Sequence, residues 1–197
     1  KNVVEICQWA GEKGLRRHLD GARLFNAAVA SGIAVADWAK HFDTVSVCFS
    51  KGLGAPVGSV LAGSKESIKR ARRARKLFGG GMRQAGIIAA GALYAMENNI
   101  ERLAEDHANA QVLARAIRQS EGLTLQPDAV DTNILISHVD PSLGTASEFV
   151  DAMRVEGILA MATAPQLIRL VTHLDVSAEH VAKACEVIKR VADSLGK

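Results

Sequence analysis

Two stretches of the sequence decide the fold: HLDGARLFNA at residues 18–27 and TVSVCFSKGLGAPVGS at residues 44–59. The first joins a short strand, predicted over residues 15–20, to a helix predicted over residues 21–30. The second begins with β-branched residues that alternate with Ser and Cys, which predicts a strand over residues 44–49. A strand, a helix and a returning strand form the repeating unit of α/β proteins. The sequence therefore predicts an α/β fold with a parallel strand pair.

The character of the chain changes near residue 120. Before this point, a strand over residues 57–62 is close enough to the preceding strand to pair with it in antiparallel fashion. After it, short strands and helices follow one another in an α+β pattern. We therefore expect two domains, 1–120 and 121–197. The other expected elements are helices over 3–10, 65–77, 85–98, 100–119, 145–156 and 178–195, and strands over 123–125, 133–138, 158–162 and 167–172.

The composition of the chain argues against several classes of function. The 197 residues are 48% hydrophobic and 23% charged, as in ordinary globular proteins, and the net charge of +3 is too small to favour nucleic acid as a partner. No apolar run approaches the roughly 20 residues that span a bilayer. Cys7, Cys48 and Cys185 are odd in number and widely spaced, so a reducing, cytoplasmic compartment is expected. The chain starts at Lys1 with no leader and opens within a predicted helix, so we expect it to be part of a longer protein.

The first group of candidate functional residues is His18, Asp20 and Arg23. Asp20 ends a predicted parallel strand, which is where α/β proteins place their ligands. His18 shares its face of the strand, and Arg23 lies at the start of the next helix. The alternative is that Asp20 only caps that helix and Arg23 makes a surface ion pair.

Lys51 is the second candidate, because it follows an apolar strand and precedes a glycine-rich loop. A partly desolvated lysine has a lowered pKa and becomes an amine nucleophile for carbonyl groups. The order of residues is not that of a phosphate-binding loop, in which Lys follows the glycines. The alternative is a solvent-facing lysine in a hairpin turn.

Asp20 and Lys51 are separated by one strand–helix–strand unit, and both lie at the carboxyl ends of strands that could be neighbours. A lysine that forms a Schiff base and a carboxylate that faces the pyridine nitrogen are the two protein groups that pyridoxal phosphate requires. The pair therefore points to this cofactor.

Three motifs, HLDGARLFNA at 18–27, SKGLGAPVGSVL at 50–61 and IRLVTHLDVS at 168–177, resemble those of low-specificity L-threonine aldolases. The resemblance implies the carboxyl-terminal part of a pyridoxal-phosphate enzyme of fold type I. Residues 1–120 would then be the remainder of its cofactor-binding large domain, and 121–197 its small domain. The implied activity is aldol cleavage of L-threonine or L-allo-threonine to glycine and acetaldehyde.

The same resemblance implies a role for each site residue. Lys51 is the Schiff-base lysine, and Asp20 is the partner of the pyridine nitrogen. Arg23 binds the phenolic oxygen of the cofactor or the substrate carboxylate, and Arg169 is the main carboxylate clamp. A planar guanidinium between apolar neighbours suits bidentate binding of a carboxylate. The resemblance also implies a homotetramer, a dimer of dimers with active sites between subunits, where Lys76 or Arg83 would be placed to reach a neighbour's cofactor phosphate.

Members of this family are about twice as long, and their upstream half supplies the phosphate-binding loop and the histidine that stacks on the ring. A separate companion amino-terminal chain is one interpretation, and deletion of the upstream half is another, in which case the chain would be an inactive fragment. Within the superfamily, the rival activities are those of a serine hydroxymethyltransferase-like enzyme and of a β-eliminating lyase. The sequence departs from the family at Arg16-Arg17, which bring two charges to a strand that is usually apolar.

Three further patterns are weaker. The run 69–76 holds six basic residues in eight, which indicates a solvated helix face, with nucleic-acid binding as the alternative. His173 and Asp175 have no third ligand at a suitable spacing, so no metal site is predicted. His138 and His180 are interpreted as structural.

Overall fold

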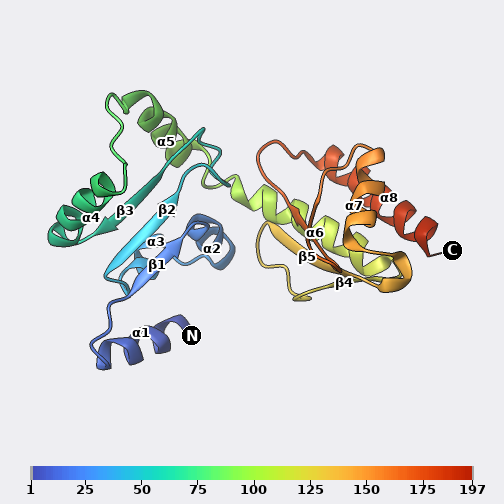
Figure 1. Ribbon diagram of the computed structural model, residues 1–197, viewed down its shortest axis with the longest axis horizontal. Coiled ribbons are helices and arrows are strands. Elements are labelled where there is room, and N and C mark those ends of the chain that lie inside the picture. The colour runs from blue at the N-terminus through green and yellow to red at the C-terminus, as the bar shows by residue number, and fades with distance from the viewer. Residues whose placement is uncertain (1, 197) are drawn as a thin grey trace. The chain divides into compact units, whose positions relative to one another are not determined.

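The computed structural model describes residues 2–196, and the chain divides between Leu103 and Ala104 into two units (Figure 1). Helix α6 (Leu103–Gln119), which the sequence placed before the change at residue 120, packs with the second unit. Its Ala110, Leu113 and Ile117 belong to the buried cluster of that unit. The cofactor-binding and small domains, assigned to 1–120 and 121–197, are functional divisions and stay a prediction.

The first unit is built around a three-stranded sheet of order β1-β2-β3. Strand β1 (His18–Gly21) pairs in parallel with β2 (Thr44–Cys48), and β2 pairs in antiparallel fashion with β3 (Ser59–Gly63). This confirms the predicted parallel return and the antiparallel third strand. Its helices are α1 (Asn2–Glu12), α2 (Leu24–Ser31), α3 (Val35–Ala39), α4 (Lys65–Leu77) and α5 (Gly86–Asn98).

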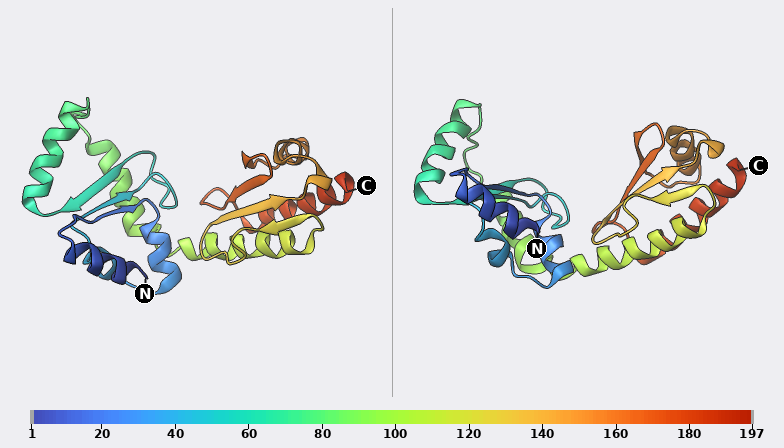
Figure 2. Two further views of the ribbon diagram at one scale, coloured as in Figure 1. Left: turned by 60° about the horizontal axis from the view of Figure 1, so that its bottom comes forward. Right: turned by 90° about the horizontal axis from the view of Figure 1, so that it is seen from below.

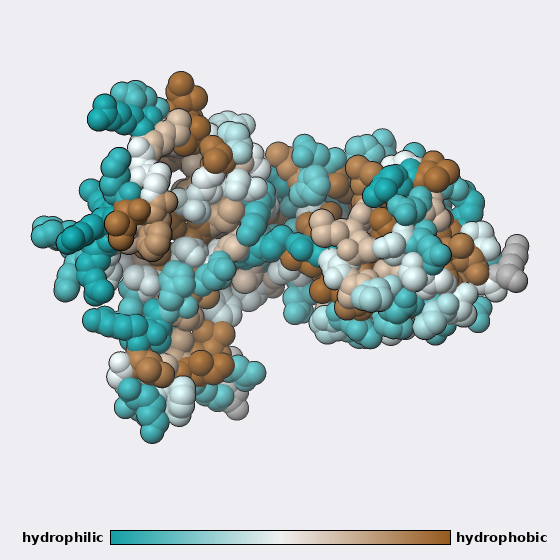
Figure 3. All heavy atoms as spheres, viewed as in Figure 1, coloured by the Kyte–Doolittle hydropathy of each residue, from teal (hydrophilic) through white to brown (hydrophobic). Residues whose placement is uncertain are grey.

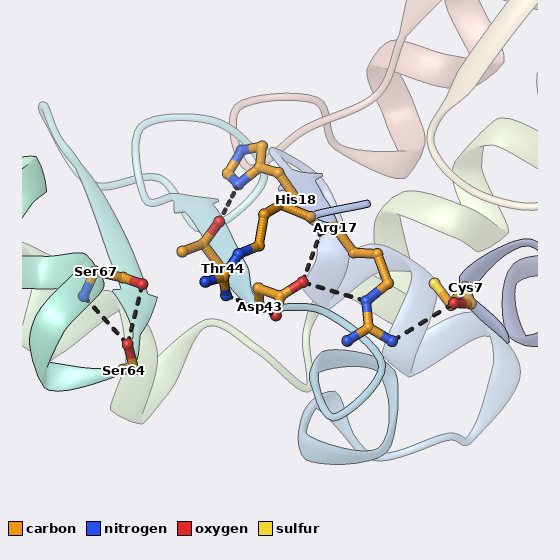
Figure 4. A network of polar contacts seen from close by, with 8 residues as sticks. Cys7, Arg17, His18, Asp43, Thr44, Ser64 and Ser67 are labelled. Carbon is orange, nitrogen blue, oxygen red and sulfur yellow. Dashed lines mark hydrogen bonds and ion pairs between the residues drawn. The ribbon is translucent and has the colours of Figure 1, made fainter. Parts of the chain in front are cut away.

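The predicted strand over residues 15–20 begins three residues later, at His18, which leaves Arg16 and Arg17 outside the sheet. The Arg17 N–H and guanidinium both donate to Asp43 Oδ2, at 2.8 and 3.2 Å (Figure 4). The guanidinium also reaches the carbonyl oxygen of Cys7 in α1, at 3.5 Å. The two charges therefore do not enter a buried strand, and Arg17 instead ties the start of β1 to the residue before β2.

The second unit holds a four-stranded sheet of order β4-β5-β7-β6, in which every neighbouring pair is antiparallel. Its strands are β4 (Leu123–Leu125), β5 (Ile134–Val139), β6 (Met161–Ala164) and β7 (Leu167–Val171), and its other elements are η1 (Pro141–Leu143), α7 (Ala146–Val155) and α8 (Ala178–Leu195). Strands β5 and β6 both run against β7, so α7 connects two strands of the same direction. Helices α6 and α8 lie along one face of this sheet (Figure 2). The α+β pattern predicted after residue 120 is confirmed.

The second unit contains the larger core. Alternate strand residues, such as Leu135 and Ile168, pack against one face of each of α6, α7 and α8, and Phe149 and Ile188 are fully buried there. The opposite face of the sheet carries Arg169 among half-buried residues.

The first unit buries much less. Its cluster of buried residues consists of Leu53, Ala55, Ala95 and Leu103, and every residue of β3 is exposed. Large apolar side chains lie on its surface, as the brown areas of Figure 3 show. They include Ile6, Trp9, Leu15, Leu77, Phe78, Met82, Ile87, Leu93 and Tyr94. Within residues 2–196, no helix is both long and apolar enough to cross a membrane.

Candidate active site

Asp20 and Lys51 are placed by the parallel pair of strands. Asp20 lies beside Ser46 in the register of β1 and β2, one residue before β1 ends. Strand β2 ends at Cys48, and Lys51 follows three residues later. Because the strands are parallel, both residues lie at the carboxyl edge of the pair, where α/β folds place ligands. The structure therefore supports the predicted placement of these two residues.

The Asp20 carboxylate holds a turn and does not cap a helix. Its Oδ1 accepts the N–H of Ala22 at 3.1 Å, which closes the turn between β1 and α2. Helix α2 begins at Leu24, and its N-cap residue is Arg23. The hydrogen bond fixes one carboxylate oxygen, and the residue is exposed, so the other oxygen is open to a ligand.

The loop that carries Lys51 is anchored on both sides of this residue. The N–H of Gly54 donates to the Lys51 carbonyl oxygen at 2.9 Å, and the N–H of Ala55 donates to that of Phe49 at 3.0 Å. Leu53 is 2% exposed and Ala55 is also buried, so the backbone is held while Lys51 itself is exposed. The expectation of a partly desolvated lysine is wrong for this structure, because Leu53 and Ala55 of the turn pack in the core while the Lys51 side chain is exposed.

Two asparagines that sequence reasoning missed support this loop. The Asn99 side-chain amide donates to the Leu53 carbonyl oxygen at 2.7 Å. Asn26 is 2% exposed in α2, and a Cβ on Gly52 would stand 3.1 Å from its Oδ1 and 2.9 Å from Leu103 Cδ2. Gly52 is therefore required by close packing. A signal was present in the sequence, since Asn26 is the one polar side chain among apolar residues in the first half of its helix.

Asp20 and Arg23 also line a cavity of about 280 Å³, together with Trp38 of α3 and Val3 of α1. Lys51 does not line this cavity. The structure thus brings Asp20 and Arg23 to one surface of the unit, while Lys51 reaches the same edge of the sheet from the neighbouring strand.

Arg169 lies in the centre of β7, in the second unit. In the register of the sheet it stands between Ile136 of β5 and Met161 of β6, so its neighbours across the sheet are apolar. Its Nε is buried and has no hydrogen-bond partner in the described part of the chain. A buried, unsatisfied charged donor is costly, so this guanidinium fits an anionic ligand.

Two residues of the first unit suit pyridoxal phosphate: the Lys51 amine is exposed, and Asp20 has an open carboxylate oxygen. Over residues 2–196, no three His, Cys, Asp or Glu side chains form a group that could hold a metal ion. Lys76, at the end of α4, and Arg83 are exposed surface cations.

The fold and this site define a mixed α/β protein with an amine and a carboxylate at one edge of its parallel strands. A family model described as beta-eliminating lyase matches residues 1–140, and the chain belongs to this family. The predicted resemblance to low-specificity L-threonine aldolases is also confirmed. The chain is 43% identical to the low specificity L-threonine aldolase of Escherichia coli K12 over 182 residues, which are 92% of this chain and 52% of that protein.

Further relatives agree. The low-specificity L-threonine aldolase 1 of Arabidopsis thaliana is 41% identical over 183 residues, which are 90% of this chain and 51% of the relative. The structure of threonine aldolase from Leishmania major matches with a TM-score of 0.77 at 21% identity, covering 96% of this chain and 56% of that one. This likeness confirms the fold class. The chain spans about half the length of the curated relatives it matches.

Proposed function

We propose that this chain is part of a pyridoxal-phosphate-dependent carbon–carbon lyase that cleaves L-threonine or L-allo-threonine to glycine and acetaldehyde. The observation that carries the proposal is the placement of Asp20 and Lys51 at one edge of a parallel strand pair. Two relatives named as threonine aldolases, at 43% and 41% identity, support the reaction. Activity is expected only together with the upstream half that these longer relatives possess.

Each residue has a distinct role in this proposal. Pyridoxal phosphate, when bound, supplies an electron-accepting ring for the bond that breaks. Lys51 holds the cofactor covalently through Nζ, and the Asp20 carboxylate stabilises a proton on the ring nitrogen. Arg23 binds a cofactor oxygen or the substrate carboxylate. Arg169 orients the substrate by its carboxylate, so that the protein selects the bond that reacts.

We further propose a homotetrameric, cytoplasmic enzyme with active sites between subunits. The apolar surface of the first unit supports an assembly that covers it. All three cysteines are free, which agrees with a reducing compartment.

Covalent attachment tests the assignment of Lys51. The protein, with its upstream half present, is incubated with pyridoxal phosphate, reduced with borohydride and mapped by peptide mass. The pyridoxyl group is expected on Lys51 and should be lost in Lys51→Ala. Lys65→Ala, which removes a different exposed lysine, serves as the matched control and should keep the label. A label that persists in Lys51→Ala would show that another lysine holds the cofactor.

The roles of Asp20 and Arg169 are tested by conservative changes. Asp20→Asn cannot stabilise a ring proton, so turnover should fall by orders of magnitude while the turn to Ala22 remains. Arg169→Lys keeps the positive charge but loses the planar guanidinium that can form two parallel hydrogen bonds. The fall in kcat/KM should correspond to a loss of about 2–4 kcal/mol of transition-state stabilisation. An amino alcohol that lacks the carboxylate should be affected far less by Arg169→Lys, and equal losses would give Arg169 a structural role.

β-Elimination is the second candidate, because the description of the matching family names it. Product analysis separates the two reactions: glycine and acetaldehyde from threonine indicate aldol cleavage, whereas release of ammonia and a keto acid indicates elimination.

A further inference from the structure

A cavity of about 510 Å³ lies in the second unit, at the carboxyl end of β7. Its wall is formed by β7, α6, α8 and the segment that follows α7. Most of its lining residues are apolar, and they include Leu113, Ile158, Leu170, Val181 and Ala184. The volume lies within the range of about 300–1,000 Å³ that is typical of small-molecule sites. Leu170 faces the helices and Arg169 the opposite side of the sheet, so the proposed lyase chemistry does not use this cavity.

The exposed rim of the cavity carries three nitrogen donors. Lys183 and His180 lie one turn apart on α8, and His173 follows β7. For the Lys183 amine, the described residues provide no hydrogen bond or ion pair. An ammonium group has three donors and no acceptor, so this rim favours an anion.

The backbone determines which imidazole nitrogens can serve a ligand. His180 Nδ1 accepts the N–H of Ser177 at 3.4 Å, and His173 Nδ1 accepts that of Asp175 at 3.3 Å. With Nδ1 as acceptor, a neutral ring carries its proton on Nε2. A protonated ring also has an Nε2–H, in which case His173 Nδ1 pairs with Asp175 Oδ2, 3.5 Å away. In either state, Nε2–H of each ring is a donor.

We propose that this cavity binds a small aliphatic carboxylate, for which octanoate is the probe. The hydrocarbon chain lies against Leu113, Leu170 and Val181, where its burial removes apolar surface from water. The carboxylate meets Lys183 at the rim, with Nε2–H of His180 as an additional donor. The rim offers one ammonium group, and its single positive charge matches the single negative charge of a carboxylate. The site is separate from the proposed lyase function and does not depend on it.

A titration of the full chain with octanoate tests the proposal. Methyl groups are labelled in Leu, Ile and Val, and their NMR shifts are followed on addition of octanoate, butyrate or octan-1-ol. Octanoate is expected to give saturable shifts confined to the cavity, including Ile158 and Leu170. Butyrate should bind more weakly because its chain is shorter, and octan-1-ol about tenfold more weakly because it lacks the charge. Equal binding of octan-1-ol, or no saturable shift with octanoate, would overturn the proposal.

Variants of two lysines on α8 distinguish a specific contact of Lys183 with the carboxylate from a general effect of positive charge. Lys183→Met should weaken octanoate about tenfold, while Lys183→Arg should retain most of the affinity. Lys189→Met removes an exposed lysine from α8 that does not line the cavity, and it should leave the affinity unchanged. An equal loss in Lys183→Met and Lys189→Met would show nonspecific attraction. Lys51→Ala should bind octanoate normally, so failure of the lyase assignment would not be confused with failure of this one.

Discussion

The two units of the chain contrast sharply in how much they bury. Among the described residues, the unit after Leu103 encloses twenty-two in one buried cluster, with Phe149, Met153 and Ile188 at its centre. The unit before Ala104 encloses four described residues in its cluster and exposes much of its apolar surface. Asp20, Arg23 and Lys51 all lie in this poorly buried unit. The residues proposed for cofactor chemistry thus lie on the part of the chain that depends most on further contacts.

Helix ends differ in the same sense. In the larger-core unit, α7 and α8 each begin with a capping box, formed by Thr145 with Glu148 and by Ser177 with His180. In the other unit, α2, α3 and α5 begin without a side-chain cap, and α4 has a serine cap, Ser64, with no capping box. Local and tertiary stabilisation therefore coincide in the unit that carries Arg169.

Separating the units should have the largest effect. Residues 104–197 should fold alone and unfold in one cooperative transition, because their core is complete within the unit. Residues 1–103 should lack a cooperative transition, since they bury little apolar surface. Chemical denaturation followed by circular dichroism checks both fragments. If both fragments unfolded with equal cooperativity, the size of the buried cluster would not predict whether a unit is stable on its own.

Truncating one side chain inside the larger core should have a smaller effect on stability than separating the units. Phe149→Ala should lower the free energy of unfolding of that unit by about 3–5 kcal/mol, since a fully buried aromatic ring leaves a cavity. Leu77 lies in α4 of the other unit, and its side chain is 80% exposed. Leu77→Ala should therefore change the free energy of unfolding of the chain by less than about 0.5 kcal/mol. Urea titrations of both variants give the two values. A comparable loss for Leu77→Ala would reveal a covered surface in solution.

The helix caps should have a smaller effect. Thr145→Ala removes the acceptor of the Glu148 N–H and should destabilise the second unit by about 1 kcal/mol. Ser64→Ala removes the corresponding acceptor in α4, which buries no residue, so it should fray the first turn without moving the global midpoint. Hydrogen exchange at the first turn of each helix, together with the midpoint, distinguishes local from global loss.

The smallest effects should appear as two pH dependences. Burial lowers the pKa of His107 in α6 below 6.5, so the neutral ring favours folding. That contribution is present above pH 6.5 and is lost as pH falls from 6.5 through the lowered value. In the other unit, the N–H and guanidinium of Arg17 lower the pKa of Asp43 below 3.8. Its contribution is therefore present above pH 3.8 and lost below it.

Stability measured between pH 8 and pH 2 tests these two windows. His107→Gln should flatten the change below pH 6.5, and Asp43→Asn the change below pH 3.8. A variant that flattens the opposite window would contradict the assignment.

Much of the fold could be predicted because its signals are local. Helices over 65–77 and 178–195 were predicted with the bounds of α4 and α8, and in the structure a serine side chain caps the first turn of each. The strand before Asp20 was predicted too long, because Arg16 and Arg17 bind Asp43, a residue far along the chain. Helix α6 was predicted from its periodicity, which does not say which unit it packs against.

The sequence by itself determined the helices and strands and the parallel strand pair. It also placed Asp20 and Lys51 at the carboxyl ends of that pair and Arg169 within a later strand. These depend on turn residues, alternation and spacing, which act over a few residues. Only the tertiary structure decided that Lys51 is exposed, that Asn99 holds its loop and that Arg169 Nε is buried without a partner among the described residues. It also decided that Lys183 lies beside an apolar cavity. Burial and hydrogen-bond partners depend on side chains brought together from distant parts of the chain, and no local pattern specifies which ones meet.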